Sequence, residues 1–188
     1  VAMSGGVDSS VAALLMLKAG HEVSGILMKV RPGPAAPGAA GSACYGHDEV
    51  EDIRAAESVC TRLGLPLHVF DCSGKFEDLV LRHFREGYLQ GTTPNPCVRC
   101  NQLIKFSVLP DVARASGLAF DRFATGHYAR VEHDPVRGRF LLKRASDLRK
   151  DQSYFLYRLS QEQLASAVFP LGSLQKSRVR AIAREEGL

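Results

Sequence analysis

The 188 residues of this chain are enough for one α/β domain with a full hydrophobic core and the start of a second module. Hydrophobic residues make up 45% of the chain, and the formal net charge of +4 permits a polyanionic partner. No apolar run approaches membrane-spanning length and no signal peptide is visible, so we expect a cytoplasmic protein that does not contact a membrane.

Apolar spacing predicts strands and helices that alternate along the chain. Helices are expected at 8–19, 48–63, 76–85 and 174–186, and helical sequence from Cys100 to Ser116 is expected to be interrupted near Pro110. Strands are expected at 22–30, 67–70 and 122–125, with a β-hairpin at 128–133 and 139–144. This alternation favours an α/β fold with a doubly wound parallel sheet, which binds its ligand at the carboxyl ends of the strands.

The chain is expected to divide into two parts near residue 144. Residues 1–144 would form the first domain, and residues 145–188 the start of a helical module. Residues 31–42 are rich in Pro, Gly and Ala and predict a mobile loop, and Asp48 with Glu51 resembles a capping box. Because Val1 lies inside an expected strand and the last helix stops at the final residues, we expect a fragment of a longer protein.

The first ten residues, VAMSGGVDSS, predict the end of a buried strand, a polar loop and the start of a helix. Backbone N–H groups in such a loop, at the positive end of a helix dipole, form a cradle for an anion. Gly5 and Gly6 would let the backbone approach phosphate oxygens, and Asp8 could hold a divalent cation against them. No lysine follows the glycines, so this is not a GxxxxGK[ST] loop, and an ordinary strand-to-helix turn stays an alternative.

Residues 91–101, GTTPNPCVRCN, place a Cys-x-x-Cys pair behind two prolines. Cys100 is expected at or near a helix N-terminus, where the dipole and the cations of Arg99 and Lys105 would lower the pKa of its thiol. This favours a nucleophilic or redox cysteine at Cys100 with Cys97 as its neighbour. Two other interpretations stay open: half of a metal or iron–sulfur site, or two structural thiols.

The chain has five cysteines, and this odd number in a protein without secretory features argues against a disulfide framework. Cys60 lies on the apolar face of an expected helix and is assigned to the core. Cys72 ends an expected strand and is interpreted as structural. The role of Cys44, in the loop rich in proline and glycine, is undecided.

Two further polar segments follow expected strands. Gly126 would allow close approach of a nucleotide, and the side chain of His127 would either donate to a phosphate or be solvated. Residues 150–155, KDQSYF, mix charges, amides and aromatic rings as contacts to single-stranded RNA do, although a solvated loop would look the same. The cations that cluster around this segment, and that favour contact with a phosphate backbone, are Lys143, Arg144, Arg149, Lys150 and Arg158.

Together, these motifs resemble the tRNA-specific 2-thiouridylases, which belong to the PP-loop ATP pyrophosphatases and put sulfur on carbon 2 of the wobble uridine in certain tRNAs. The resemblance covers essentially the whole chain. It rests on the order and spacing of five segments, at 2–10, 93–106, 124–130, 150–156 and 169–180. It implies the Rossmann-like fold of the adenine nucleotide alpha hydrolases, with residues 1–144 as the ATP-binding catalytic domain and a tRNA-contacting module after it.

The resemblance also implies roles for individual residues. Those that would bind ATP are Ala2, Met3, Ser4, Gly5, Gly6, Val7, Asp8, Ser9, Met28 and Gly126. Those that would contact tRNA are Asn95, Pro96 and Cys97, against the target base, and Lys150, Asp151 and Gln152. Cys100 matches the catalytic nucleophile. Some relatives carry an aspartate at the position of Cys97, so Cys97 would substitute for that carboxylate in catalysis, support Cys100, or do neither.

The implied reaction uses ATP, with Mg²⁺, to adenylate the uracil oxygen and release pyrophosphate. A cysteine persulfide, loaded by a sulfur-donor protein, then supplies sulfur at carbon 2 while AMP leaves. The persulfide cysteine would lie beyond Leu188. Two alternatives stay open: another PP-loop enzyme that adenylates a small molecule, and an iron–sulfur-dependent tRNA thiolase with Cys97 and Cys100 as ligands.

Overall fold

The computed structural model describes residues 1–31 and 49–188. Three sequence predictions therefore fall outside the described residues: nearly all of the loop at 31–42, the cap at Asp48, and the surroundings of Cys44. Within the described ranges, every helix is too short or too polar to span a bilayer.

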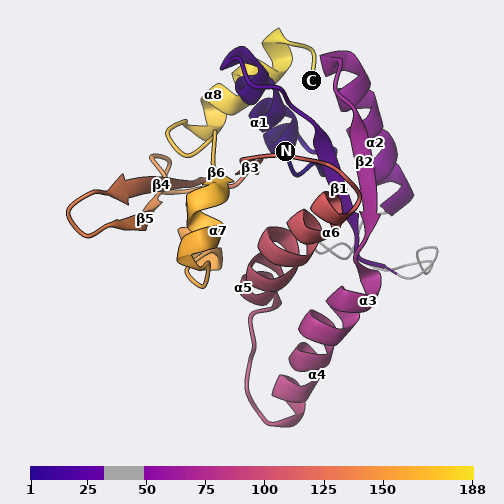
Figure 1. Cartoon of the computed structure of the whole chain (residues 1–188), viewed down its shortest axis with the longest axis vertical. Helices are drawn as coiled ribbons and strands as arrows, with labels where there is room; N and C mark the ends of the chain where they lie inside the picture. Colours follow the sequence, from indigo (N-terminus) through magenta and orange to yellow (C-terminus); the bar gives the residue numbers. More distant parts are fainter. Residues whose placement is uncertain (32–48) are drawn as a thin grey trace.

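A parallel sheet lies at the centre of the fold (Figure 1). Its strands form two parallel pairs, β1 (Gly25–Lys29) with β2 (Leu67–Asp71) and β3 (Phe123–Ala124) with β6 (Ala167–Val168). Residues 1–3 join the pairs, because the Met3 N–H donates to the Ile26 carbonyl (2.7 Å) and the Ala2 N–H donates to the Ala124 carbonyl (2.8 Å). The order is β2, β1, residues 1–3, β3, β6, and the predicted α/β fold is confirmed.

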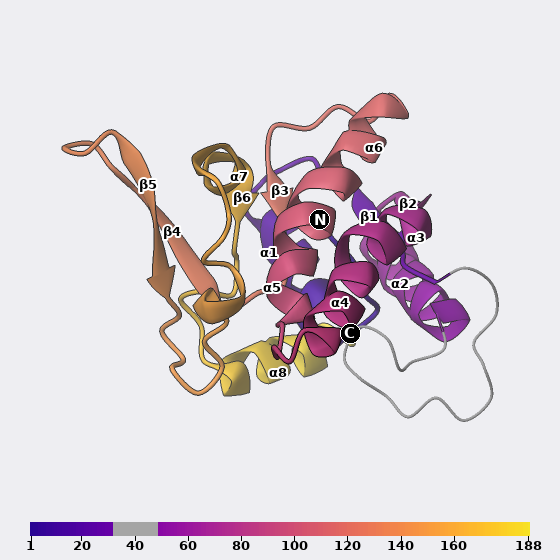
Figure 2. The ribbon, with the colours of Figure 1, turned by 90° about the horizontal axis from the view of Figure 1, so that it is seen from below.

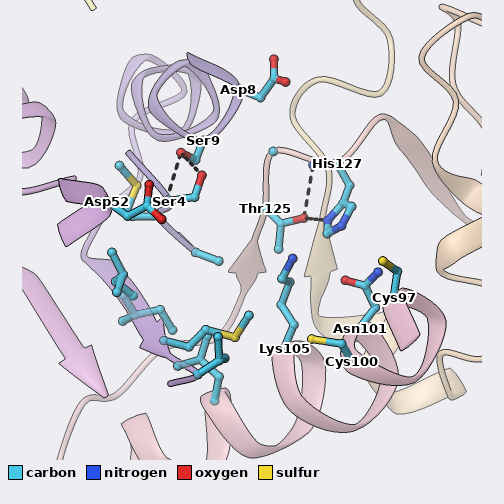
Figure 3. Close-up of a pocket in the computed structure, with 18 of the residues that line it drawn as sticks. Ser4, Asp8, Ser9, Asp52, Cys97, Cys100, Asn101, Lys105, Thr125 and His127 are labelled. Atoms are coloured by element: carbon cyan, nitrogen blue, oxygen red, sulfur yellow. Dashed lines mark hydrogen bonds between the residues drawn. The ribbon is translucent and has the colours of Figure 1, made fainter. Parts of the chain in front are cut away.

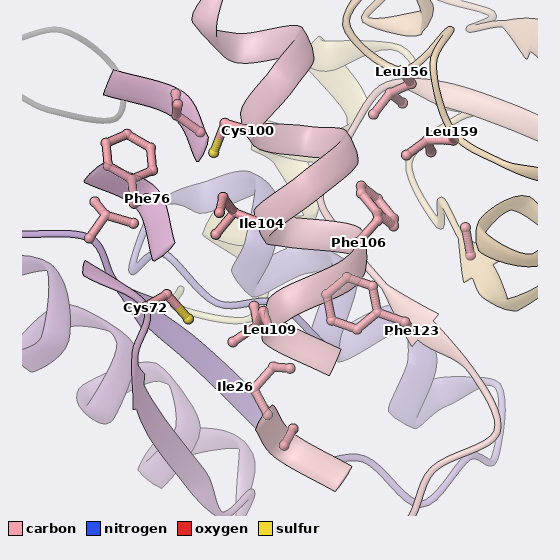
Figure 4. Close-up of a cluster of buried hydrophobic side chains, with 14 of the residues drawn as sticks. Ile26, Cys72, Phe76, Cys100, Ile104, Phe106, Leu109, Phe123, Leu156 and Leu159 are labelled. Atoms are coloured by element: carbon pink, nitrogen blue, oxygen red, sulfur yellow. The ribbon is translucent and has the colours of Figure 1, made fainter. Parts of the chain in front are cut away.

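Successive side chains of β1 point into different cores, as the two-residue period of a strand requires. Ile26 belongs to one core cluster, with Ile104 and Leu109 of the helical run that covers one face of the sheet (Figure 4). Leu27 belongs to another, with Ala56 and Cys60 of α2 (Glu49–Leu63). Helices therefore cover both faces of the sheet.

Two helical runs contain π-helical turns. The first consists of α3 (Ser73–Phe76), η1 (Glu77–Leu81) and α4 (Arg82–Leu89), and the second of α5 (Pro96–Cys100), η2 (Asn101–Val108) and α6 (Leu109–Ala115). The predicted interruption near Pro110 is a change of helix type: the π-helical turns end at Val108, and α6 begins at Leu109 with Pro110 in its first turn, although the run itself continues. Pro110 has no N–H to give to the Phe106 carbonyl four residues earlier, and the Gln163 amide donates to that carbonyl instead (3.1 Å). An outside donor thus replaces the missing hydrogen bond.

The predicted β-hairpin is confirmed: β4 (Ala129–Asp134) pairs antiparallel with β5 (Arg139–Arg144) and projects from the rest of the molecule in both views (Figures 1 and 2). After the short turn η3 (Ser153–Phe155) come α7 (Gln161–Ser166) and α8 (Lys176–Glu185). α8 packs on α1 (Val7–Lys18), where Val179 and Val11 share a core cluster. β6 and α8 follow residue 144 in the sequence, but they pack against β3 and α1, which precede it. The division of the chain into two parts at residue 144 stays a prediction.

Candidate functional site

A pocket of about 520 Å³ opens at the carboxyl-terminal ends of the parallel strands, the edge predicted for the ligand (Figure 3). The predicted site residues that line it are Ala2, Met3, Ser4, Asp8, Ser9, Met28, Cys97, Cys100, Gly126 and Gln152. The predicted residues outside its lining are Gly5, Gly6, Val7, Asn95, Pro96, Lys150 and Asp151. The polar residues that the sequence did not assign to it include Glu49, Asp52, Asn101 and Thr125.

The Ser/Gly loop between residues 1–3 and α1 is held in shape by its own serines. The Ser9 hydroxyl donates to the Gly6 carbonyl (2.9 Å), accepts from the Ser4 N–H (3.2 Å) and lies 3.2 Å from the Ser4 hydroxyl. The Ser10 hydroxyl also donates to the Gly6 carbonyl (3.0 Å). The first N–H groups of α1 have no acceptor within the helix, and its dipole makes this end positive. The loop is therefore held in one shape at the positive end of α1, an arrangement that would suit an anion.

Two glycines of this site are required by packing. Gly5 has a φ of +71°, and a Cβ built on it would lie 2.6 Å from the Cβ of Ala55 in α2. At Gly126 a Cβ would lie 2.8 Å from the carbonyl carbon of Asp8 and 2.9 Å from the nitrogen of Ser9. The prediction that Gly126 admits a nucleotide stays a prediction, whereas its contacts bring the end of β3 against the start of α1.

The Asp8 carboxylate is bound to protein groups at the first turn of α1. Its Oδ1 accepts from the Tyr128 hydroxyl (2.9 Å) and from Nζ of Lys176 at the start of α8 (2.5 Å). Burial, and next the hydrogen bond to Asp8, raise the pKa of Tyr128, so its phenol stays protonated and donates. Figure 3 shows this carboxylate turned away from Ser4. Asp52 also lines the pocket, and its carbonyl oxygen would lie 3.0 Å from a Cβ built on Gly5 of the loop. Sequence patterns gave no signal for Lys176, which is 168 residues from Asp8.

The two thiols lie in the first turns of the helical run that begins at Pro96. Asn95 caps this run, with its side-chain oxygen accepting from the N–H groups of Cys97 (3.0 Å) and Val98 (3.3 Å). The helix therefore starts earlier than predicted, so that Cys97 lies in its first turn and Cys100 in the second. Cys97 is exposed, Cys100 is 6% exposed, and both line the pocket. The dipole argument made for Cys100 applies better to Cys97.

Lys105 and His127 lie between the thiols and the Ser/Gly loop (Figure 3). His127 Nδ1 is 2.7 Å from the Thr125 hydroxyl, and its ring lies 6.1 Å from each of the rings of Phe106 and Phe169. Burial and, second, the charge of Lys105 hold the pKa of His127 well below its usual 6.5. The imidazole is therefore neutral at neutral pH, and Lys105 is the cation at this part of the pocket.

Residues 150–152 have three different environments. Lys150 is exposed to solvent. The Asp151 carboxylate accepts from the Ala145 N–H (2.7 Å) and from the Ser153 hydroxyl (2.7 Å). The Gln152 side chain accepts from the Tyr128 N–H (2.9 Å) while lining the pocket. Asp151 and Gln152 thus fix the path of this segment, and Lys150 is directed outwards.

The thiols of Cys60 and Cys72 are buried in the core, as predicted. Burial, and next the charge of Asp71, raise the pKa of Cys72 to about 11, so this thiol is protonated and unreactive at neutral pH. Over residues 1–31 and 49–188, no group of three or more His, Cys, Asp and Glu side chains could hold a metal ion. An iron–sulfur cluster on Cys97 and Cys100 would need its other ligands from outside these residues.

The sequence profile of the tRNA methyl transferase HUP domain family matches residues 1–188. The chain belongs to this family. The motif-based resemblance is confirmed as well, because the chain is 50%, 49% and 47% identical to proteins named tRNA-specific 2-thiouridylase MnmA from Mycolicibacterium smegmatis, Geotalea uraniireducens and Endomicrobium trichonymphae.

These three alignments cover all of this chain and 50%, 49% and 52% of the relatives. The chain thus spans about half the length of the curated relatives it matches. Among solved structures, the HUP-domain fold is similar to a predicted subunit of tRNA methyltransferase from Methanocaldococcus jannaschii. That structure has a TM-score of 0.51 and 16% identity, over 97% of this chain and 72% of that chain. At this identity the likeness supports the fold alone.

Proposed function

We propose that this chain is the ATP-dependent catalytic part of a tRNA 2-thiouridylase. The observation that carries the proposal is that the Ser/Gly loop and the thiols of Cys97 and Cys100 open into one pocket. A nucleotide phosphate at the loop and a base near the thiols would then share one pocket. The names of the relatives support tRNA as the substrate.

ATP would bind with its phosphates at the N-terminus of α1, where backbone N–H groups and the Ser4 hydroxyl can donate to them. Lys105 would stabilise the negative charge that develops on the reacting phosphate. Mg²⁺, when bound, would neutralise phosphate charge. Asp8 was predicted to hold it, but its carboxylate binds Lys176 and Tyr128, which leaves Asp52, another carboxylate of the pocket lining, as the candidate.

The first step would make the uracil a better electrophile. Its 2-oxygen attacks the α-phosphorus, pyrophosphate leaves with the electrons of the broken phosphorus–oxygen bond, and the N3 proton is lost to solvent. The thiolate of Cys100 then attacks a cysteine persulfide supplied from outside this chain, forming a disulfide and releasing hydrosulfide. Hydrosulfide adds at carbon 2, and AMP leaves with the former 2-oxygen. Alternatively, the persulfide adds directly and Cys100 resolves the adduct as a disulfide.

The surface around residues 148–158 fits an RNA strand. Tyr154 and Tyr157 are 65% and 64% exposed, and their ring centroids are 6.3 Å apart. Arg149, Lys150 and Arg158, which are close to the tyrosines in the sequence, are exposed as well. Exposed aromatic rings among cations are the usual platform for unstacked bases and their phosphates. Phe155, between the tyrosines, lines the pocket, so this surface continues into the site.

Two substitutions in the intact protein would separate activation from sulfur transfer. Ser9→Ala removes the hydroxyl that shapes the Ser/Gly loop and should abolish both tRNA-dependent pyrophosphate release and 2-thiouridine formation. Cys100→Ser should keep pyrophosphate release and lose 2-thiouridine, because a serine hydroxyl is too weakly acidic to replace a thiolate. Cys60→Ser is the control and should cost only stability.

The assays are pyrophosphate release and mass spectrometry of the tRNA nucleosides, with ATP, Mg²⁺ and a persulfide donor. The proposed roles would be wrong if Cys100→Ser thiolated tRNA as wild type does, or if Ser9→Ala released pyrophosphate at the wild-type rate. Wild-type protein that released pyrophosphate with a small molecule in place of tRNA would indicate a different PP-loop enzyme.

A further inference from the structure

Asn101 is a buried amide whose hydrogen-bonding capacity is only partly used. It is 5% exposed, follows Cys100 in the helix and lines the pocket. Its Nδ2 donates to the Phe155 carbonyl (3.4 Å), which assigns the other end of the amide to Oδ1. Within the described ranges, this Oδ1 is a buried atom without a hydrogen-bond partner. A buried acceptor in this state costs free energy unless a ligand supplies a donor.

The position of Asn101 indicates what kind of ligand would meet it. Cys97, Asn101 and Lys105 are spaced four residues apart, lie on one face of the helical run and all line the pocket (Figure 3). Along this face, a thiol, an amide oxygen and an ammonium group follow one another. The amide oxygen thus lies between a thiol of the pocket and the cation suited to a phosphate, one residue after the proposed nucleophile Cys100.

We infer that Asn101 Oδ1 accepts the N3–H of the target uracil and so makes Asn101 a specificity-determining residue. This inference rests on the proposed function. N3–H is the only ring N–H of a uridine and is bonded to carbon 2, the atom that receives sulfur, so an acceptor beside the thiols meets it. Cytidine has an unprotonated N3, and its lone pair would face the Oδ1 lone pairs.

The test compares binding of two RNAs to the intact protein without ATP, so that no reaction occurs. The RNAs are anticodon stem-loops with uridine or 3-methyluridine at the target position, and binding is measured by fluorescence anisotropy. Wild-type protein should bind the uridine RNA about tenfold more tightly, the effect of one hydrogen bond. Asn101→Ala should bring the ratio of the two affinities to about one, because it removes the acceptor and makes room for the methyl group.

A second variant separates recognition from folding. Asn101→Leu has a similar volume and removes the unpaired Oδ1, but it also removes the donor to the Phe155 carbonyl. The two effects oppose one another, so its melting temperature should stay close to that of wild type. An amide needed only for the fold would instead lower the melting temperature in Asn101→Leu and leave the affinity ratio of Asn101→Ala unchanged. Gln161→Ala is the control, because Gln161 exchanges hydrogen bonds with Phe140 away from the pocket. It should keep the wild-type ratio.

A wild-type affinity ratio that persists in Asn101→Ala would overturn the inference while leaving the proposed function intact. If the KM for ATP also rose in that variant, the amide would contact the nucleotide instead of the uracil. Failure of the proposed function is a separate result: wild-type protein would form no 2-thiouridine in tRNA with ATP and a persulfide donor.

Discussion

His127 is neutral in this pocket because of what surrounds it. Its ring lies near the rings of Phe106 and Phe169, and Lys105 adds a like charge that opposes protonation. Since its folded-state pKa is well below the usual 6.5, the unfolded chain binds more protons between these two values. The contribution of His127 to stability is therefore complete above pH 6.5 and is lost as the pH falls below it.

We expect His127→Gln to reduce the loss of stability in mild acid. Between about pH 6 and 5, the wild-type free energy of unfolding should fall with pH by up to about 1.4 kcal/mol per unit more than that of the variant. Urea unfolding at a series of pH values measures this difference. His83→Gln, which changes an exposed histidine, should keep the wild-type slope. Equal slopes for wild type and His127→Gln would refute the assigned pKa shift.

At this scale, sequence predicted the residues of the pocket better than their interactions. Four of the predicted residues line the pocket: Ser4, Ser9, Cys97 and Cys100. Each belongs to a motif whose local geometry is set by neighbouring residues in the chain. The Asp8 carboxylate is different, because its partners lie 120 and 168 residues away. Such distant pairs leave no mark on a local pattern.

The elements that sequence missed are those that tertiary contacts define. β6 has two residues, too few for alternation to show, and it exists because it pairs with β3. α7 has six residues and begins with a capping box at Ser160. Its Gln163 side chain also donates to the carbonyls of Gln102 and Phe106 in the neighbouring helical run. Longer amphipathic helices such as α2 were predictable, since their periodic pattern spans several turns.

Gly172 joins the segment after β6 to the hairpin, and replacing it should disrupt that junction. A Cβ at this position would lie 1.9 Å from the Ala129 carbonyl oxygen, and the Gly172 carbonyl accepts from the Ser146 N–H (2.9 Å). Because all of these contacts are with backbone, Gly172→Ala should lower the free energy of unfolding by about 3 kcal/mol or more.

Gly74→Ala is the matched control in α3. A Cβ there meets nothing within 4 Å, so the substitution should be neutral or stabilising by up to about 1 kcal/mol. Denaturant unfolding of both variants gives the comparison. If Gly172→Ala were as stable as Gly74→Ala, the close approach to β4 would not exist in solution.

At the scale of the whole molecule, α8 near the end of the chain packs on α1 near its start. Two ion pairs join it to α1, between Lys176 and Asp8 at the start of α1 and between Lys18 and Glu186 at its other end. Lys176 is 19% exposed, whereas Lys18 is 56% exposed. One pair therefore lies at the proposed phosphate site, and the other serves only to hold the helices together.

Lys176→Met should weaken ATP binding, because the Asp8 carboxylate would then repel the incoming phosphates without its cation. We expect the KM for ATP in tRNA-dependent pyrophosphate release to rise about tenfold in the intact protein. Lys18→Met breaks the other pair of the same interface and should leave this KM unchanged, with a loss of stability below about 1 kcal/mol. Equal KM values in the two variants would mean that Lys176 only links α8 to α1. If the KM for ATP rose only in Lys176→Met, the ammonium group of Lys176 would act in the nucleotide site.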